Sequence, residues 1–239
     1  MLWLTLLNTL TYLSKYLMVI TIGSVKGGVG KSTIATTLAV FLSIRLDSKV
    51  MLIDADSQGT SCYFTSLRQE QRGTAGYTSI ELTGNKLHEE IRALVRRYDD
   101  IVVDVGGRDT ASQRAALAVS DAYVVPLSLQ AFDIWALRDV LELLDQLKPF
   151  NPNLTTFFVA NRTDYRGTKS SAFEEMATSI KEAYGITLLP HTLSNRIAYS
   201  KAASAGYTVL DPEYANQEPK AVAEVTTLFD HITQVLKNR

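Results

Sequence analysis

A glycine-rich loop at residues 26–33, which reads KGGVGKST, constrains the fold of this 239-residue chain more than any other segment. It follows an apolar run from Met18 to Gly23 that is typical of a buried strand, and it precedes apolar side chains at helical spacing. Glycines at 27, 28 and 30 let successive backbone N–H groups point toward one anion, and the following helix adds the positive end of its dipole. The segment therefore predicts a strand, a phosphate-binding loop and a helix.

The lysines and hydroxyl side chains of this loop indicate a nucleoside triphosphate. Lys31 would supply a point charge to the β- and γ-phosphates, and the Ser32 hydroxyl would face Mg²⁺. The usual pattern GxxxxGK[ST] requires a glycine at position 25, where this chain has Val25. The strict motif therefore fails by one residue, and the additional lysine, Lys26, requires an explanation.

Composition limits the class of protein. A formal charge of −1 and an apolar content of 46% fit one large domain with a substantial core. The single cysteine, Cys62, excludes an intrachain disulfide framework and leaves too few thiolates for a cysteine-based metal site, so we expect a reducing, cytoplasmic compartment. The near-neutral net charge argues against a histone-like mode of nucleic-acid binding, although a protein of neutral net charge can still carry a local basic patch.

Apolar, β-branched runs alternate with helical patterns along the chain. Further strands are expected at Lys49–Ile53, 101–105, Ala122–Leu127, Thr155–Ala160 and Ile186–Leu189, and helices at 32–46, Lys86–Tyr98, 109–119, 132–147 and 169–184. This alternation predicts an α/β fold with a doubly wound, mostly parallel sheet and helices on both faces. Ligands of such sheets bind at the carboxyl ends of the strands. The polar segment 67–85 has no clear pattern.

Residues 1–17 stand apart from the single domain expected at 18–239. Their leucines recur at helical spacing without an acidic residue, which is compatible with a surface helix. Lys15 is the one cation, the segment lacks the features of a signal peptide, and it is too short to span a bilayer comfortably. The alternative is that Met18 is the true start, because a strand begins there at once.

Carboxylates follow two of the expected strands. Asp54 and Asp56 come directly after one apolar run, and their spacing places both side chains on one side if the extended geometry continues. One of them can approach a metal while the other orients a water for attack on a γ-phosphate. Asp104 lies in the apolar run IVVDV, where a carboxylate suits Mg²⁺. Singly, each acid also fits an ordinary loop, but together with the glycine-rich loop they predict a magnesium–nucleotide site.

With these residues the chain resembles the ParA/MinD group of deviant-Walker ATPases, from Met18 to the C-terminus. The resemblance implies a P-loop ATPase domain in which Lys26 reaches across a nucleotide-sandwich homodimer to the partner's phosphates. Lys31, Ser32 and Thr33 would contact phosphate and magnesium within their own subunit. The residues that would hold the ATP are Lys26, Gly27, Gly28, Val29, Gly30, Lys31, Ser32 and Thr33, together with Asn161.

The resemblance also implies roles for the polar residues outside the glycine-rich loop. Asp54 and Asp56 match the family's DxD(P)QG element, in which Ser57 replaces the proline and Asp56 positions the attacking water. Asp104 matches its DxxG switch element. Asn161 matches the asparagine that reads adenine, for which an amide offers a donor and an acceptor together. The magnesium ligands implied are Ser32, Asp54 and Asp104.

Three classes of protein function are compatible with such an ATPase. The first is a small ParA-type partition or positioning ATPase, whose ATP-bound dimer binds DNA without sequence preference and is released when a ParB-like adaptor stimulates hydrolysis. Such a protein is nucleoid-associated. Segment 191–211 resembles the family's DNA-contacting segment, with Arg196 and Lys201 as candidates, and ordinary surface cations are the alternative. If Met18 is the start, there is no room for an N-terminal helix-turn-helix.

The second class is a MinD-like protein that cycles on a membrane, and the third is a metabolic enzyme of the same fold. A membrane cycler needs a basic amphipathic tail, whereas residues 221–239 have an apolar side with few cations opposite it. We therefore expect this tail to pack on the core, and we expect no membrane partner. A shared iron–sulfur cluster would need more than one cysteine per subunit, and the eleven tyrosines are scattered, which disfavours an autokinase.

Overall fold

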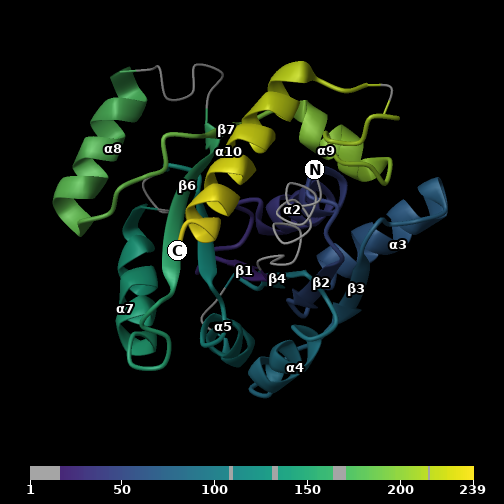
Figure 1. Ribbon diagram of the computed structural model, residues 1–239. Helices are drawn as coiled ribbons and strands as arrows, with labels where there is room; N and C mark the ends of the chain where they lie inside the picture. Colours follow the sequence, from purple (N-terminus) through teal and green to yellow (C-terminus); the bar gives the residue numbers. More distant parts are fainter. Residues whose placement is uncertain (1–16, 108–109, 131–133, 164–170, 215) are drawn as a thin grey trace, which may run out of the picture.

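A parallel sheet forms the centre of the computed structural model, which describes residues 17–107, 110–130, 134–163, 171–214 and 216–239. Its strands are β1 (Met18–Ile22), β2 (Val50–Ala55), β3 (Thr78–Glu81), β4 (Asp100–Val105), β5 (Ala122–Leu127), β6 (Thr155–Thr163) and β7 (Leu193–Ser194). In the described part of the chain they form one seven-stranded sheet in the order β3-β2-β4-β1-β5-β6-β7 (Figure 1). The predicted doubly wound α/β fold is confirmed.

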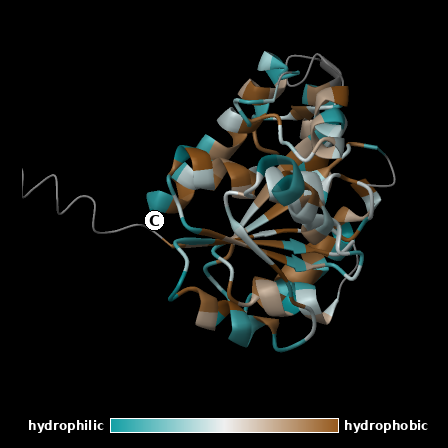
Figure 2. Ribbon diagram, turned by 90° about the vertical axis from the view of Figure 1, so that its right-hand side faces the viewer, coloured by the Kyte–Doolittle hydropathy of each residue, from teal (hydrophilic) through white to brown (hydrophobic). Residues whose placement is uncertain are grey.

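Helices cover both faces of the sheet (Figures 1 and 2). They are α2 (Lys31–Arg45), α3 (Thr60–Arg72), α4 (Leu87–Leu94), α5 (Ala111–Leu117), α7 (Leu137–Leu147), α8 (Ser171–Tyr184), α9 (Ile197–Ser204) and α10 (Pro219–Lys237). Side chains of a strand alternate between faces. Ile20 and Ile22 of β1 therefore pack with α2 and α10, whereas Val19 packs with α4 and α5. A further apolar cluster lies between β5, β6, α7 and α8.

The register of the parallel strands brings three loops together. Ile22 of β1 is paired with Asp104 of β4, and Asp54 of β2 is paired with the same Asp104. Because the carboxyl ends of parallel strands lie at one edge, the glycine-rich loop after β1 meets the turns that follow β2 and β4. The predicted nucleotide residues are thus neighbours in space although they are far apart in sequence.

The C-terminal helix α10 packs on the core, as the tail pattern predicted. Phe229 of α10 meets Phe41 of α2 edge to face, with 5.4 Å between the ring centroids, and its neighbours Val225, Leu228 and Ile232 are also buried. The apolar side of this helix is therefore already occupied by the domain. None of the helices in the described part of the chain has the length and apolarity needed to cross a membrane.

The structure corrects one predicted strand and assigns the segment that had no clear pattern. The strand predicted at Ile186–Leu189 is wrong: Leu188 makes a single bridge with Phe158, and β7 forms later, at Leu193–Ser194. Ile186 and Leu188 are apolar because they fill the cluster beside α7 and α8. The unassigned segment 67–85 contains the end of α3 and the edge strand β3. Except for Leu17, the predicted N-terminal extension lies outside the described residues.

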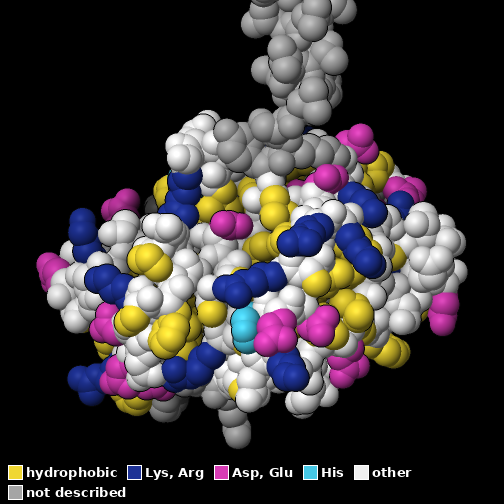
Figure 3. Space-filling view, turned by 60° about the horizontal axis from the view of Figure 1, so that its bottom comes forward, with side chains coloured by type: hydrophobic (Ala, Val, Ile, Leu, Met, Phe, Trp, Pro, Cys, Tyr) yellow, Lys and Arg dark blue, Asp and Glu magenta, His cyan; other side chains and the backbone are white. Residues whose placement is uncertain are grey.

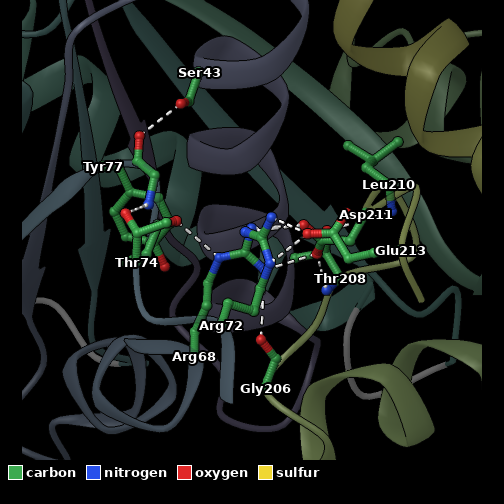
Figure 4. Close-up of polar contacts among 12 residues, drawn as sticks. Ser43, Arg68, Arg72, Thr74, Tyr77, Gly206, Thr208, Leu210, Asp211 and Glu213 are labelled. Atoms are coloured by element: carbon green, nitrogen blue, oxygen red, sulfur yellow. Dashed lines mark hydrogen bonds and ion pairs between the residues drawn. The ribbon is translucent and has the colours of Figure 1, made fainter. Parts of the chain in front are cut away.

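A buried ion pair connects the polar helix α3 to Asp211. Arg68 of α3 is 1% exposed, and its Nη1 and Nη2 donate to the two carboxylate oxygens of Asp211 at 2.7 and 2.6 Å (Figure 4). Arg72 of α3 lies 3.3 Å from the same carboxylate. Burial by itself would raise the pKa of Asp211, but the hydrogen bonds and charge of Arg68 hold it below its usual range. The pair fastens α3 to the segment between α9 and α10.

Arg68→Met tests this anchor. The substitution leaves Asp211 buried with weaker partners, so we expect the free energy of unfolding in urea to fall by about 3 kcal/mol. Arg45→Met is the matched control, because the Arg45–Asp230 pair is 3.8 Å long and about half exposed. Its loss should change stability by no more than about 0.5 kcal/mol. Equal effects of the two substitutions would contradict the structural role of Arg68.

Candidate functional site

The glycine-rich loop joins β1 to α2 and leaves the start of that helix open. Gly28 and Gly30 have φ angles of 78° and 91°, in the left-handed region that favours glycine. The Ser24 hydroxyl donates to the Lys26 carbonyl at 2.7 Å, which holds the curl of the loop. No side chain caps α2, and its first turn has no acidic residue. The free N–H groups and the positive end of the helix dipole can therefore bind an anion.

A cavity of about 740 Å³, here called the phosphate cavity, lies over this loop. Its lining residues come from the carboxyl edge of the sheet: Gly27, Gly28, Gly30, Lys31, Ser32, Thr33, Asp56, Ser57, Gln58, Thr60, Gly106, Gly107, Thr110 and Arg162. Lys31 belongs to this lining and Lys26 does not. Lys26 instead lines a neighbouring cavity of about 390 Å³ together with Ser128 and Gln130. The two lysines therefore serve different surfaces of the same loop.

Lys31 is a buried cation. It is 7% exposed, and its Nζ donates to the Lys26 carbonyl at 3.2 Å. Burial lowers its pKa, while the negative charges of Asp104 and Asp56 act in the opposite direction. A cation with little solvation is well placed to gain from a bound phosphate.

Asp104 is completely buried and only partly hydrogen-bonded. Burial raises the pKa of its carboxyl to about 6, although the Ser61 hydroxyl, which donates to Oδ2 at 2.6 Å, lowers it. The other oxygen, Oδ1, has no hydrogen-bond partner among the described residues. An unpaired buried oxygen is unfavourable, and a hard divalent cation such as Mg²⁺ would satisfy it. The donor at this position therefore fits the predicted magnesium ion.

Asp54 and Asp56 have separate surroundings. Asp54 is buried, which raises its pKa, and its oxygens accept the backbone N–H groups of Asp56 at 3.2 Å and Cys62 at 2.9 Å. It therefore holds the turn between β2 and α3. Asp56 lines the phosphate cavity, and its Oδ1 accepts the N–H of Gln58 at 3.1 Å. The sequence predicted both carboxylates on one side, but of the two only Asp56 lines the cavity.

Asn161 connects the end of β6 to the glycine-rich loop. Its Nδ2 donates to the Val29 carbonyl at 2.7 Å, and its Oδ1 accepts the N–H of Arg162 at 2.9 Å. One amide hydrogen and one acceptor position remain for a ligand. Asn161 also lines a second cavity of about 480 Å³, here called the side cavity, which shares Gly30, Thr33 and Arg162 with the phosphate cavity.

Arg196 is not the free surface cation that the DNA prediction requires. Its side chain is 8% exposed, its Nη2 lies 2.7 Å from Oε1 of Glu224, and it also forms an ion pair with Glu218. These carboxylates raise the pKa of Arg196 and hold the start of α9 against α10. Lys201, in the last turn of α9, is exposed. Of the two predicted DNA contacts, only Lys201 is available to an external phosphate in this structure.

Two residues of the site were not found from the sequence. Ser61 is buried at the start of α3 and fixes one oxygen of Asp104. Arg162 follows Asn161 and lines both cavities. For Ser61 the available signal was a hydroxyl residue close behind the two aspartates, whereas an arginine after Asn161 has no distinguishing pattern.

Comparison with known protein families agrees with this geometry. The family model described as the CobQ/CobB/MinD/ParA nucleotide binding domain matches residues 20–209. That range contains the whole glycine-rich loop, both aspartate turns, Asn161 and α9. The match therefore covers every residue described above as lining the phosphate cavity.

Individual relatives cover most of the chain at low identity. The maintenance of carboxysome distribution protein A of Halothiobacillus neapolitanus is 26% identical over 189 residues, which are 79% of this chain and 84% of that protein. The chromosome-partitioning ATPase Soj of Thermus thermophilus is 24% identical over 233 residues, 85% of this chain and 91% of that protein. An ATP complex of Cyanothece McdA covers 92% of this chain and 98% of its own with a TM-score of 0.73 and 17% identity, a likeness of fold.

Gly107→Ala tests the contact between the turn after β4 and the glycine-rich loop. A Cβ at position 107 would lie 2.8 Å from the backbone nitrogen of Gly27, so one of the two segments must move. We expect nucleotide affinity to weaken about tenfold or more and stability to fall by about 1–3 kcal/mol. Binding is followed by titration with a fluorescent ATP analogue.

Gly106→Ala is the control for this prediction. A Cβ at position 106 would make an ordinary contact of 3.5 Å with Asp56. It should therefore leave the affinity within about a factor of three of the wild type. If Gly107→Ala also bound nucleotide like the wild type, the close approach of the two loops would not matter for binding.

Proposed function

The chain belongs to the CobQ/CobB/MinD/ParA nucleotide-binding domain family, and we propose that it is an ATPase switch that dimerises on ATP and positions DNA or another cargo. The observation that carries the proposal is the convergence of Lys31, Asp56 and Asp104 around the open start of α2. Each of these groups has a distinct part in binding or cleaving a magnesium-bound triphosphate. The names of the relatives support a role in positioning or partitioning.

Each of the two cavities would hold a different part of the nucleotide. In this proposal the triphosphate occupies the phosphate cavity against Lys31, Ser32 and Thr33, which all line it. The adenine occupies the side cavity, where the remaining donor and acceptor of Asn161 are available to its edge. Asp104 and Ser32 would hold Mg²⁺, and a bound Mg²⁺ would neutralise part of the phosphate charge. Asp56, on the cavity wall, orients the attacking water.

Lys26 makes the ATP-bound state a dimer. Two subunits that face each other through their phosphates repel, and cations are needed between them before they can close. Lys26 is half-buried and does not line the phosphate cavity of its own subunit, which suits a lysine that acts on the partner. A charge-assisted contact contributes about 1.5–3 kcal/mol, enough to make dimerisation depend on the γ-phosphate. Hydrolysis then resets the switch.

The proposed output of the dimer is binding to non-specific DNA, with release when an adaptor protein stimulates hydrolysis. Lys201 is the exposed cation of the family-like segment, and dimerisation doubles its number. The face at the lower edge of Figure 1, seen in Figure 3, carries Lys and Arg side chains interspersed with Asp and Glu. That mixed face is a weaker candidate for a phosphate backbone. Because α10 is packed on the core, a membrane-anchoring tail is the less favoured alternative.

Substitutions in the phosphate cavity separate binding from turnover. Lys31→Ala should abolish ATP binding, because a buried cation that contacts phosphate is lost. Asp56→Ala should keep ATP binding and dimerisation but lower turnover by at least about 100-fold, because the water is no longer oriented. Equilibrium titration, light scattering and phosphate release measure the three properties. Normal hydrolysis by the Asp56 variant would refute its assigned part.

Co-sedimentation with random-sequence DNA and, separately, with anionic liposomes tests the output. We expect ATP-dependent retention on DNA that weakens steeply with salt, and no retention on liposomes. Lys201→Glu should lower the DNA affinity about tenfold or more without changing ATP binding. Arg92→Glu introduces the same charge change at an exposed position of α4 and should have a smaller effect. Retention on liposomes alone would favour the membrane-cycling alternative.

A further inference from the structure

Arg162 occupies an irregular position at the end of β6. The pairing of β6 with β7 shifts register between Asn161 and Thr163, so Arg162 lies on a β-bulge. Its φ angle is 56°, a left-handed conformation that is unfavourable for a residue with a Cβ. Bulges beside functional sites re-aim a side chain, and strained backbone is kept where the surroundings impose it. The bulge therefore fixes the direction in which the Arg162 side chain leaves the strand.

Hydrogen bonds on both sides hold the bulge. The Arg162 N–H donates to Oδ1 of Asn161, whose Nδ2 is bound to the Val29 carbonyl of the glycine-rich loop. On the other side, the N–H of Asn195 donates to the Thr163 carbonyl at 2.8 Å. The unusual conformation of Arg162 is thus tied directly to the loop that receives phosphate.

The side chain of Arg162 is exposed and makes no hydrogen bond or ion pair with the described residues. It lines the phosphate cavity, the side cavity and the cavity beside Lys26, and it is the one described residue common to all three. Among the described residues that line the phosphate cavity, Asp56 is the only carboxylate. A guanidinium at this junction therefore adds positive charge where several phosphate charges would be bound.

We propose that Arg162 is a nucleotide-binding residue that contacts the phosphates of the bound nucleotide from the β6 side. A guanidinium matches phosphate oxygens with paired N–H donors and gains charge-assisted hydrogen bonds there. Such a contact gives the strained bulge a function, because the αL backbone carries the side chain to the place where the cavities meet. The inference rests on the proposed binding of ATP. In it, Arg162 is a second cation that contacts the phosphates bound in its own subunit, in addition to Lys31.

The test compares the affinities of the full-length protein for ATP, ADP and adenosine in the presence of Mg²⁺, by competition with a fluorescent ATP analogue. Arg162→Ala should weaken ATP and ADP about tenfold or more and leave adenosine unchanged, because adenosine has no phosphate. Arg162→Lys should recover part of the loss. Arg138→Ala, which removes an exposed arginine of α7, is the matched control and should bind all three ligands like the wild type.

Arg162→Gly separates the side chain from the strained backbone. Glycine adopts a positive φ without penalty, so this variant should melt at a higher temperature than Arg162→Ala in the absence of nucleotide while sharing its weak binding of ATP. It also keeps the proposal testable if the alanine variant folds poorly.

Three outcomes would overturn the proposal. Affinities for ATP and ADP that stay within about twofold of the Arg138→Ala control would exclude a phosphate contact by Arg162. An equal loss for ATP, ADP and adenosine would place the guanidinium against the base or ribose. Both of these results leave the ATPase proposal intact. Failure of the wild-type protein to bind ATP would overturn the proposed function and this inference together.

Discussion

The parallel pairing of β4 with β1 and β2 is the constraint on which the site depends. It sets Asp104 beside Ile22 on one side and beside Asp54 on the other, immediately below the glycine-rich loop. No local property of any one loop could produce this arrangement, because the three segments are separated by whole helices. The hydrophobic strands supply the stability, and their register decides which polar side chains meet at the carboxyl edge.

The site holds several groups in unfavourable surroundings. Lys31 is buried with a lowered pKa, one oxygen of Asp104 has no hydrogen-bond partner among the described residues, and α2 starts without a side-chain cap. A magnesium-bound triphosphate would satisfy all three at once, so much of its binding free energy would come from relieving these costs. Arg162 is a further group in an unfavourable state, because its backbone is in a left-handed conformation and its exposed side chain lies where the cavities meet.

Helix α3 links the site to a distant part of the chain. At its start, Ser61 donates to Asp104 and the N–H of Cys62 donates to Asp54. At its other end, Arg68 is bound to Asp211, in the segment that joins α9 to α10. One short helix therefore contacts both the carboxylates that would sense the nucleotide and the region that follows Lys201.

Three features of the chain were not readable from the sequence because they depend on partners far along the chain or on burial. The polar pattern of α3 concealed a helix, because Arg68 is buried only by virtue of Asp211 far along the chain. Arg196 looked like a surface cation until Glu218 and Glu224 of the last helix region were placed against it. The run Ile186–Leu189 looked like a strand because burial in a cluster selects the same apolar residues as pairing in a sheet.

The sequence alone determined the strand–loop–helix unit around Lys31 and the alternation that specifies an α/β sheet. Those features are encoded locally, through glycine conformation, apolar periodicity and the chemistry of phosphate binding. Only the tertiary structure decided that Asp54 holds a turn while Asp56 lines the cavity, that Arg196 is neutralised, and that Arg162 faces the site. These outcomes depend on register, burial and long-range ion pairs, which no local pattern records.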